Sequence, residues 1–378
     1  MSCNVTLETI ISLAKRRGFV FQSGEIYGGL NGVYDIGPLG TLLKNNLRRA
    51  WIHNVTNIEN DVVIMEGALL GGEQMWKASG HIENFHDPMV DCLNCKKRFR
   101  ADELDLEKPC PSCGKKEWTA VREFNLMFKT QLGAMQDASS VAYLRPETAQ
   151  AIFINFKNVL TSCRVKMPFA IGQMGKSFRN EITPKQFMFR TREFEQMELE
   201  WFCHGDRAAA DFEFWLAQRY KFYQMLNLNM DRLRFRAHKM DELSHYAVSC
   251  TDVEYEFPFG WKELEGIANR GAFDLTQHSK HSGKDLSVFD ESTGTKYMPH
   301  VVECSVGADR LMLTVLFDAY CEEQVGDETR TVLKLHPALA PITAAFMPLS
   351  KQQEEAAPSL PAAGDDGHAL RTRSLPLF

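Results

Sequence analysis

Residues 178–201 read FRNEITPKQFMFRTREFEQMELEW, and this stretch decides the fold. Side chains alternate between the two faces of an extended chain, so residues 187–201 are predicted to have one polar and one mostly apolar face. The polar face carries Arg190, Arg192, Phe194, Gln196, Glu198 and Glu200, and the apolar face carries Phe187, Phe189, Thr191, Met197, Leu199 and Trp201, interrupted by Glu193 and Glu195. A strand with one solvated face would alternate in the same way, so alternation alone leaves a ligand face and a solvent face both open.

The residues just before this segment favour a ligand. FRNE at 178–181 ends a preceding strand, so a hairpin brings together Arg179, Glu181, Arg190 and Phe194. Arginine binds phosphate through its planar set of donors, and a phenylalanine ring offers a flat surface to a base. Phe194 and Glu198 are four strand steps apart, roughly 13 Å. That span matches the distance from an adenine ring to a group beyond the α-phosphate, so Glu198 is predicted to hold a cationic amine.

Patterns along the rest of the chain indicate an α+β fold. Apolar residues recur at helical spacing after Pro38, an apolar helix follows LRPET at 144–148, and residues 206–250 are expected to be mostly helical. VEYEF at 253–257 is predicted to be a strand, and residues 299–320 a strand that leads into a long helix. Strands and helices do not alternate strictly, which favours an antiparallel sheet flanked by helices over a doubly wound parallel sheet.

Composition limits the class of protein. The chain has 378 residues with 44% hydrophobic and 24% charged residues and a formal net charge of −6, which is ordinary for a globular protein. No apolar run is long enough to suggest a membrane span, and the N-terminus does not resemble a signal peptide. We therefore expect no membrane association and a cytoplasmic location.

Four of the ten cysteines form two tight pairs within an insertion expected at 86–120. Cys92 and Cys95 are separated by two residues, as are Cys110 and Cys113, which is the spacing of a tetrahedral zinc site. Four thiolates leave no open position on the metal, so we predict a structural zinc in a knuckle-like insertion. Four reduced cysteines without metal are the alternative. Neighbouring basic residues, among them Lys96 and Lys97, are a candidate contact for nucleic-acid phosphates.

Three segments in order resemble the motifs of class II aminoacyl-tRNA synthetases. The segment from Phe178 to Phe194 resembles motif 2, and PHVVECSVGADRLMLTVLFDAY at 299–320 resembles motif 3. Pro38 in DIGPLG resembles the motif 1 proline at the dimer interface of that class. Longer stretches, including AKRRGFVFQSGEIYGGLNGVYDIGPLG, RPET, FPFGWKELEGIANRGAFDL and RTVLKLHPALAP, resemble glycyl-tRNA synthetases of the homodimeric type over roughly residues 8–350.

The resemblance implies a fold and an activity. The expected fold is a class II catalytic core with a six-stranded antiparallel sheet flanked by helices. The expected activity is glycine–tRNA ligation, in which glycine is activated with ATP and Mg²⁺ to glycyl-adenylate and transferred to tRNA(Gly) by a homodimer. An activation-only enzyme and a non-catalytic nucleic-acid-binding or regulatory relative are the alternatives.

The resemblance also assigns roles to residues. Arg179 and Arg310 are expected to be catalytic, binding the α- and γ-phosphates, while Glu263 helps to hold ATP and its Mg²⁺. The expected ATP-binding set is Arg179, Asn180, Glu181, Phe189, Arg190, Thr191, Arg192, Phe194, Glu263, Leu264, Gly307 and Arg310. The expected glycine-binding set is Arg100, Glu147, Phe194, Gln196, Glu198, Glu303 and Ser305. Glu303 and Ser305 are expected to clash with the methyl group of a larger amino acid, and Cys304 stands where the family often has proline.

The resemblance weakens toward the C-terminus. We expect a catalytic domain at 1–325, a remnant of an anticodon-binding domain at 326–350 and a disordered tail at 351–378. A strand is predicted around Leu335–Leu349, and packing after about residue 325 is expected to be poor, because one orphan strand has little core of its own.

Overall fold

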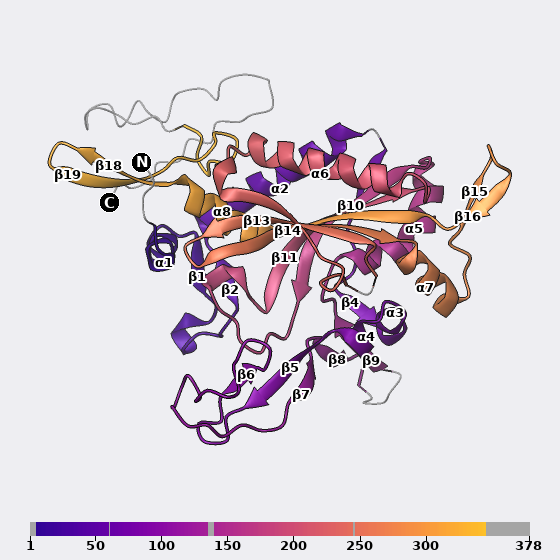
Figure 1. The fold of residues 1–378 in the computed structure, drawn as a ribbon. Coiled ribbons are helices and arrows are strands. Elements are labelled where there is room, and N and C mark those ends of the chain that lie inside the picture. The colour runs from indigo at the N-terminus through magenta and orange to yellow at the C-terminus, as the bar shows by residue number, and fades with distance from the viewer. Residues whose placement is uncertain (1–4, 60, 135–139, 245, 345–378) are drawn as a thin grey trace.

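The computed structural model of the protein describes residues 5–59, 61–134, 140–244 and 246–344 and is built around one large sheet (Figure 1). The sheet has seven strands in the order β12-β13-β14-β17-β11-β10-β3. Their bounds are β3 Val62–Met65, β10 Phe169–Phe178, β11 Glu193–Cys203, β12 Leu233–Ala237, β13 Ser249–Phe257, β14 Gly260–Gly271 and β17 His300–Gly307.

Six of these strands pair antiparallel, which confirms the predicted antiparallel sheet, but a seventh strand makes the sheet mixed. β3 pairs parallel with β10, with Val62 opposite Ala170. The run VVIM is too short to be recognised as a strand from periodicity. β12 was also missed, because residues 206–250 were interpreted as mostly helical. The helix α6 covers only Ala208–Met225, and the alternating LRFRA run that follows the 3₁₀ turn η4 (Met230–Arg232) forms the edge strand.

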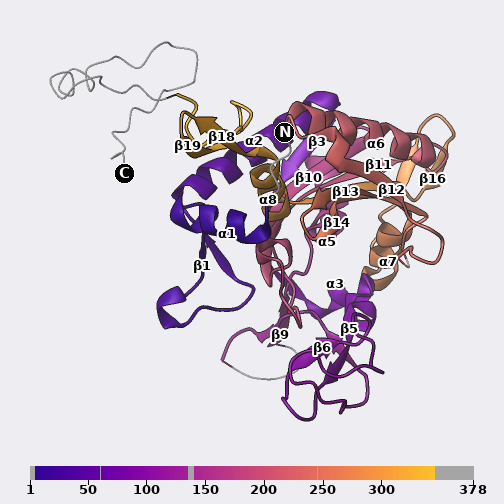
Figure 2. The ribbon, with the colours of Figure 1, turned by 60° about the vertical axis from the view of Figure 1, so that its left-hand side comes forward.

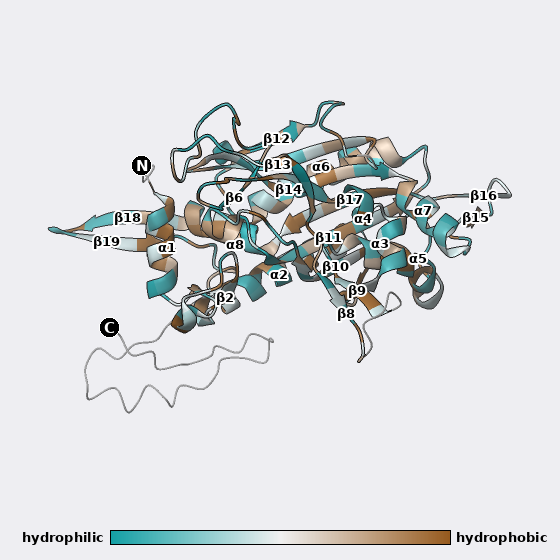
Figure 3. Ribbon diagram, turned by 90° about the horizontal axis from the view of Figure 1, so that it is seen from below, coloured by the Kyte–Doolittle hydropathy of each residue, from teal (hydrophilic) through white to brown (hydrophobic). Residues whose placement is uncertain are grey.

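Helices cover one face of the sheet completely and the other face in part. α6, α2 (Pro38–Ile58) and α8 (Ala308–Ala319) enclose the larger core with the side chains of Met197, Leu199 and Trp201 from β11. On the opposite face, α5 (Ala149–Cys163) and α7 (Phe273–Ser282) pack over a smaller core. Figure 3 shows the hydrophobic colours concentrated in the central strands and α8. On the rest of this second face, β11 presents the side chains of Gln196, Glu198 and Glu200, and we call it the ligand face after the ligand predicted there.

The start of α2 explains the DIGPLG sequence. Pro38 occupies the first turn, where its missing N–H costs nothing. Gly18 adopts a positive φ of 68° and its carbonyl accepts a hydrogen bond from the Leu39 N–H at 3.0 Å. A Cβ atom on Gly40 would lie 2.0 Å from the Phe19 carbonyl oxygen, so only glycine fits. This tight corner joins α2 to α1 (Leu7–Arg16) and to the hairpin of β1 (Val20–Gln22) and β2 (Tyr34–Ile36), the arm seen in Figure 2.

The cysteine-containing insertion lies on the ligand side of the sheet, below it in Figures 1 and 2. It consists of a three-stranded sheet of β5 (His86–Asp91), β6 (Arg98–Arg100) and β7 (Arg122–Asn125). A second small sheet connects it to the core, together with two short helices. These elements are β4 Leu70–Gly72, β8 Lys129–Gln131, β9 Val141–Leu144, α3 Glu73–Ala78 and α4 His81–Asn84. Residues 86–120, the predicted insertion, lie within the segment from β5 to β7, whose small sheet is separate from the central sheet.

The segment after α8 differs from its prediction. A hairpin of β18 (Tyr320–Val325) and β19 (Glu328–Leu333) precedes the predicted strand, and residues 335–344 contain no strand. Most described residues after 325 are exposed or half-buried, as expected of a poorly packed segment, but Leu339 is an exception, since it is 1% exposed in the main core. Asn46 on α2 donates hydrogen bonds to the carbonyls of Leu339 and Ala340 at 3.1 and 2.9 Å. The predicted tail at 351–378 lies outside the described residues. A second hairpin, β15 (Val288–Asp290) with β16 (Thr295–Tyr297), extends from the other end of the molecule.

Candidate active site

The segment from 187 to 201 is not one continuous strand. Phe187–Phe189 form a 3₁₀ turn, η3, and β11 begins at Glu193, so Arg190 and Arg192 belong to the hairpin loop. The alternation is correct within β11. Gln196, Glu198 and Glu200 all lie on the ligand face and are buried, which excludes the solvent-face interpretation of these three side chains.

Arg179 lies at the centre of the nucleotide half of the site. Its guanidinium is over the ring of Phe194, 5.3 Å from the ring centre, and over Phe85 at 5.2 Å. Its Nε donates to the carbonyl of Pro146 at 3.1 Å. The cation and the aromatic surface predicted for a nucleotide are therefore adjacent, and the charge is held by contacts that leave other guanidinium nitrogens available for a phosphate.

The hairpin loop is fixed by ion pairs on its ligand side. Arg190 Nε donates to Glu181 at 2.6 Å, and Arg190 Nη1 donates to Glu103 of the insertion at 2.9 Å. Arg192 donates to the Glu181 carbonyl at 3.0 Å, and the Asn180 N–H donates to the Leu126 carbonyl at 2.7 Å. Loop and insertion therefore hold each other in place.

Motif 3 closes the nucleotide half through Arg310. Its guanidinium is 4.5 Å from the centre of the Phe189 ring, and Nε donates to the Phe189 carbonyl at 3.1 Å. Arg310 Nη1 also lies 3.4 Å from Glu263 Oε1. Leu264, by contrast, is 1% exposed in the larger core, on the face of the sheet that α6, α2 and α8 cover. Only its backbone can therefore face a nucleotide.

One cavity contains these nucleotide-binding candidates. Its lining consists of Arg179, Glu181, Met188, Phe189, Arg190, Thr191, Phe194, Glu195, Gly307, Asp309 and Arg310. Motifs 2 and 3, far apart in sequence, thus form a single site. Met188, Glu195 and Asp309 were not predicted. The strand pattern places Glu195 on the apolar face, away from the expected ligand. Asp309 directly precedes Arg310, and the resemblance assigned a role only to the arginine.

A cluster of carboxylates lies further along β11, toward the middle of the sheet. Glu198 is opposite Ser305 on β17, and Glu200 is opposite Glu303. Carboxylate oxygens of Glu198, Glu200 and Glu303 lie within 4.8 Å of one another. The predicted glycine-binding residues on β11 and β17 therefore converge, and Gln196 joins them through a 3.3 Å hydrogen bond to the Ser305 hydroxyl.

Burial and mutual repulsion alter the ionisation of this cluster. Burial, with the charges of Glu303 and Glu147, raises the pKa of Glu198 to about 8. Burial and the charges of Glu303 and Glu198 raise the pKa of Glu200 well above its ordinary value, and burial also raises that of Glu303. An ammonium group placed here would favour ionisation, because an opposite charge stabilises a carboxylate.

Glu147 borders the same cluster from the loop before α5. Its carboxylate accepts from Gln150 at 2.9 Å and lies 3.3 Å from His81 Nε2. Burial alone would raise the pKa of Glu147, but His81 and Arg270 lower it well below its ordinary range. The pKa of Glu147 is therefore shifted in the direction opposite to those of Glu198, Glu200 and Glu303.

Arg270 is a site residue that the sequence did not reveal. It lies on β14, is 2% exposed, and its Nη1 donates to Glu303 at 2.6 Å. Its Nε donates to Asp274 on α7 at 2.7 Å. Thr148 was also missed, and its hydroxyl donates to Glu198. Both residues are within motifs quoted above, NRGAFDL and RPET, but a single arginine or threonine gives no pattern that distinguishes it.

The described hydrogen bonds of Arg100 go to residues of the insertion and not to the carboxylate cluster. Arg100 donates to Asp87 at 2.5 Å and to Asp102 at 2.6 Å. Asp87 lies 3.6 Å from Arg190, so Arg100 is linked to the nucleotide half through the insertion. The resemblance grouped Arg100 with glycine, whereas these contacts place it beside the hairpin loop.

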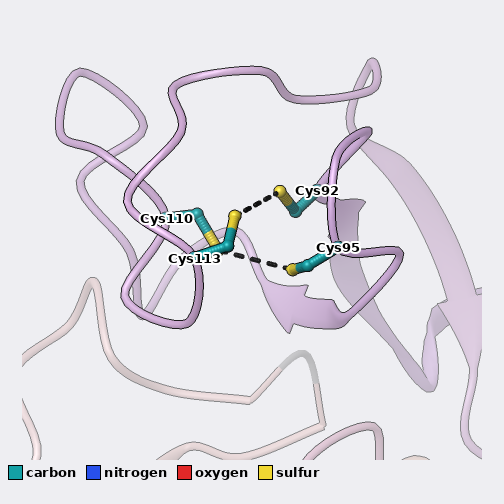
Figure 4. Close-up of side chains that lie close together, drawn as sticks. All are labelled: Cys92, Cys95, Cys110 and Cys113. Carbon is teal, nitrogen blue, oxygen red and sulfur yellow. Dashed lines mark hydrogen bonds between the residues drawn. The ribbon is translucent and has the colours of Figure 1, made fainter.

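The four cysteines of the insertion converge as predicted (Figure 4). Cys92 Sγ lies 3.6 Å from Cys113 Sγ, and Cys95 Sγ lies 3.8 Å from Cys110 Sγ. These separations exceed a disulfide bond, about 2.05 Å, and match the roughly 3.8 Å between sulfurs around a tetrahedral zinc with bonds of about 2.3 Å. The two turns are alike, since Lys96 and Gly114 both have positive φ and donate to the Cys92 and Cys110 carbonyls.

A mostly antiparallel sheet with an arginine and a phenylalanine adjacent at one end of β11, and buried carboxylates further along it, agrees with the core of a class II aminoacyl-tRNA synthetase. The family model of the tRNA synthetase class II core domain (G, H, P, S and T) matches residues 128–320. The glycine–tRNA ligase of Caldanaerobacter subterraneus subsp. tengcongensis is 50% identical to this chain, in an alignment that covers 94% of this chain and 83% of that relative. The chain belongs to the glycine–tRNA ligase family.

Two further relatives support this assignment. The glycine–tRNA ligases of Treponema denticola and Borreliella afzelii are 51% and 53% identical, over 92% and 93% of this chain and 79% and 80% of their own lengths. Among the described residues, no helix combines the length and apolar character needed to cross a membrane.

Proposed function

We propose that the protein activates glycine with ATP and transfers it to the 3′ end of tRNA(Gly). The observation that carries this proposal is the composition of β11. This strand supplies Phe194 to the nucleotide cavity and Glu198 to the carboxylate cluster. A nucleotide and a small amine bound along it would meet at the α-phosphate, where the new bond forms.

The proposed chemistry requires positioning and charge neutralisation. The glycine carboxylate is already a nucleophile, so its in-line attack on the α-phosphorus needs no general base. The bond to pyrophosphate breaks as the mixed anhydride forms. In this proposal Arg179 binds the α-phosphate and the attacking carboxylate, and Arg310 binds the γ-phosphate. Mg²⁺ held with Glu263 would neutralise phosphate charge.

The carboxylate cluster supports selection of glycine. The α-ammonium group would bind among Glu147, Glu198 and Glu303 through charge-assisted hydrogen bonds. Arg270 fixes Glu303, and Thr148 fixes Glu198, so neither carboxylate can easily move to admit a side chain. We propose that the rigidity of these two carboxylates, together with Ser305, excludes alanine and serine.

The remaining assignments are proposals of the same kind. We infer a structural zinc on the four cysteines, a homodimer formed partly by the arm (the hairpin of β1 and β2), and a cytoplasmic location. The arm contains the 3₁₀ turn η1 (Glu25–Tyr27) and exposes Ile26 at 88% and Tyr27 at 90% of their surface. Such exposed apolar residues are typical of interaction sites.

Aminoacylation of tRNA(Gly) with labelled glycine tests the complete function. The protein is expected to charge tRNA(Gly), and Lys96→Ala/Lys97→Ala is expected to reduce charging while leaving adenylate formation unchanged. These two lysines lie on the insertion and are exposed. Adenylate formation without any charging would support the activation-only alternative. Equal charging by wild type and variant would show that the two lysines do not contact tRNA.

A further inference from the structure

A buried ion-pair network lies behind the nucleotide cavity, on the covered face of the sheet. Lys44 of α2 is 4% exposed. Its Nζ lies 2.7 Å from Asp309 Oδ1 and 2.8 Å from Glu195 Oε2. Arg48, one turn further along α2, donates from Nε to Glu195 at 2.6 Å. One lysine therefore joins three elements, α2, β11 and α8.

The two residues whose carboxylates bind Lys44 are sequence neighbours of residues proposed to bind the nucleotide. Glu195 lies between Phe194 and Gln196 on β11, and Asp309 directly precedes Arg310 at the start of α8. The Glu195 N–H donates to Asp309 Oδ2 at 2.7 Å, which ties the start of α8 to the strand. Any shift of these carboxylates would move Phe194 relative to Arg310.

Charge balance makes Lys44 necessary for this arrangement. Burial tends to lower the pKa of Lys44, but Asp309 and Glu195 raise it above its ordinary value, so the lysine is charged. Arg48 and Lys44 likewise lower the pKa of Glu195 against the effect of burial. Without the ammonium, Glu195 would keep its ion pair with Arg48, but the buried carboxylate of Asp309 would have no cation beside it among the described ion pairs.

We propose that Lys44 is a positioning residue for the ATP site, which sets the distance between the Phe194 ring and Arg310 by binding Glu195 and Asp309 from behind the sheet. The proposal rests on the proposed function, because it assumes that Phe194 and Arg310 bind ATP. Lys44 does not line the nucleotide cavity. Its effect on ATP would therefore be transmitted through the two carboxylates.

A second buried ion pair provides a matched control. Arg219 on α6 and Glu265 on β14 are both fully buried on the same covered face, with Nε to Oε1 at 2.7 Å. Arg219 touches neither Glu195 nor Asp309 among its described hydrogen bonds and ion pairs. Arg219→Met breaks a comparable buried ion pair in the same layer and leaves the contacts of Glu195 and Asp309 intact, so it controls for the loss of a buried ion pair as such.

The test compares Lys44→Met with Arg219→Met in the whole protein. Equilibrium binding of a non-hydrolysable ATP analogue gives the Kd, and glycine-dependent ATP–pyrophosphate exchange gives KM for ATP and kcat. We expect Lys44→Met to raise the Kd and the KM for ATP about tenfold or more. Arg219→Met should lower the melting temperature with less than about a threefold change in either constant.

A rescue variant separates positioning from general damage. Lys44→Met/Asp309→Asn removes the unpaired charge and keeps an acceptor for the Glu195 N–H, so ATP affinity should recover at least in part. Lys44→Gln serves if Lys44→Met does not fold. Unchanged ATP constants in a destabilised but folded Lys44 variant would overturn the proposal, as would equal losses in Lys44→Met and Arg219→Met. Wild-type protein that binds the analogue but shows no exchange would instead contradict the proposed function.

Discussion

Glu200 is the least satisfied polar side chain near the glycine half of the site. It is fully buried, and within the described part of the chain neither carboxylate oxygen has a hydrogen-bond partner. Charged groups facing it are Glu198, Glu303, Arg270 and Asp274, while its neighbour on β10 is the apolar Ile171. An unpaired buried carboxylate would be costly, so Glu200 is expected to be protonated at neutral pH.

Glu200→Gln tests this ionisation state. Glutamine imitates a neutral acid, so the KM for glycine should change less than about threefold at pH 7. A buried acid with a raised pKa binds its proton more tightly in the folded state, and stability therefore falls as pH rises above the ordinary value of the group. The variant should lose less stability than wild type between pH 5 and pH 8 in urea unfolding. A tenfold or larger rise in KM would mean that Glu200 acts as an anion.

At the scale of elements, the motif-bearing strands and helices were predictable because each carries its own pattern. β11, β17 and α8 alternate or repeat over many residues, and the CxxC pairs fix the insertion. Other features depend on tertiary partners. The four residues of β3 become a strand only beside β10, and the loss of alternation at Arg190 follows from the turn at Phe187–Phe189. Arg270 and Lys44 are recognisable only once their buried carboxylate partners are known.

The zinc insertion is predicted to depend on its metal. Metal analysis should find about one zinc per chain, and Cys110→Ser should lose it, because three thiolates bind less tightly than four. Hydrogen exchange should then increase in β5, β6 and β7 and remain unchanged in the central sheet. Wild-type protein purified without chelator that contains no zinc would show that the four cysteines are simply reduced thiols.

The segment after β19 is predicted to be part of the catalytic core. Leu339 is buried, so Leu339→Ala should reduce the free energy of unfolding by about 2–4 kcal/mol. Its backbone N–H donates to the His336 carbonyl at 2.8 Å and should exchange slowly. Leu335→Ala, at a partly buried position nearby, is the control and should cost less. Rapid exchange at Leu339 would favour the original expectation of a poorly packed remnant.

At the scale of the whole molecule, the exposed apolar arm contacts the motif 2 loop directly. The Gly32 carbonyl on the arm accepts from the Arg192 N–H at 2.7 Å, and Arg192 also donates to Asn31 at 2.6 Å. The arm is therefore attached to the motif 2 loop. A partner subunit that covers the arm would at the same time support this loop.

A homodimer is accordingly predicted to favour ATP binding. Tyr27→Asp/Ile26→Asp should shift the protein toward monomer in sedimentation analysis and raise the KM for ATP, because the motif 2 loop loses support. Leu70→Asp, which changes an exposed apolar residue away from the arm, should leave the oligomeric state unchanged. A wild-type protein that is monomeric at micromolar concentration would exclude this account of the arm.

Glycine-dependent ATP–pyrophosphate exchange tests the central claim most directly. Wild-type protein should exchange pyrophosphate into ATP with glycine and not with alanine or serine, since the proposed ammonium site between the fixed carboxylates is expected to exclude a side chain. Arg179→Ala should abolish the exchange, because its guanidinium is placed to bind the α-phosphate beside Phe194. Folded, zinc-loaded wild-type protein that gives no exchange with glycine, or gives equal exchange with alanine, would contradict the account.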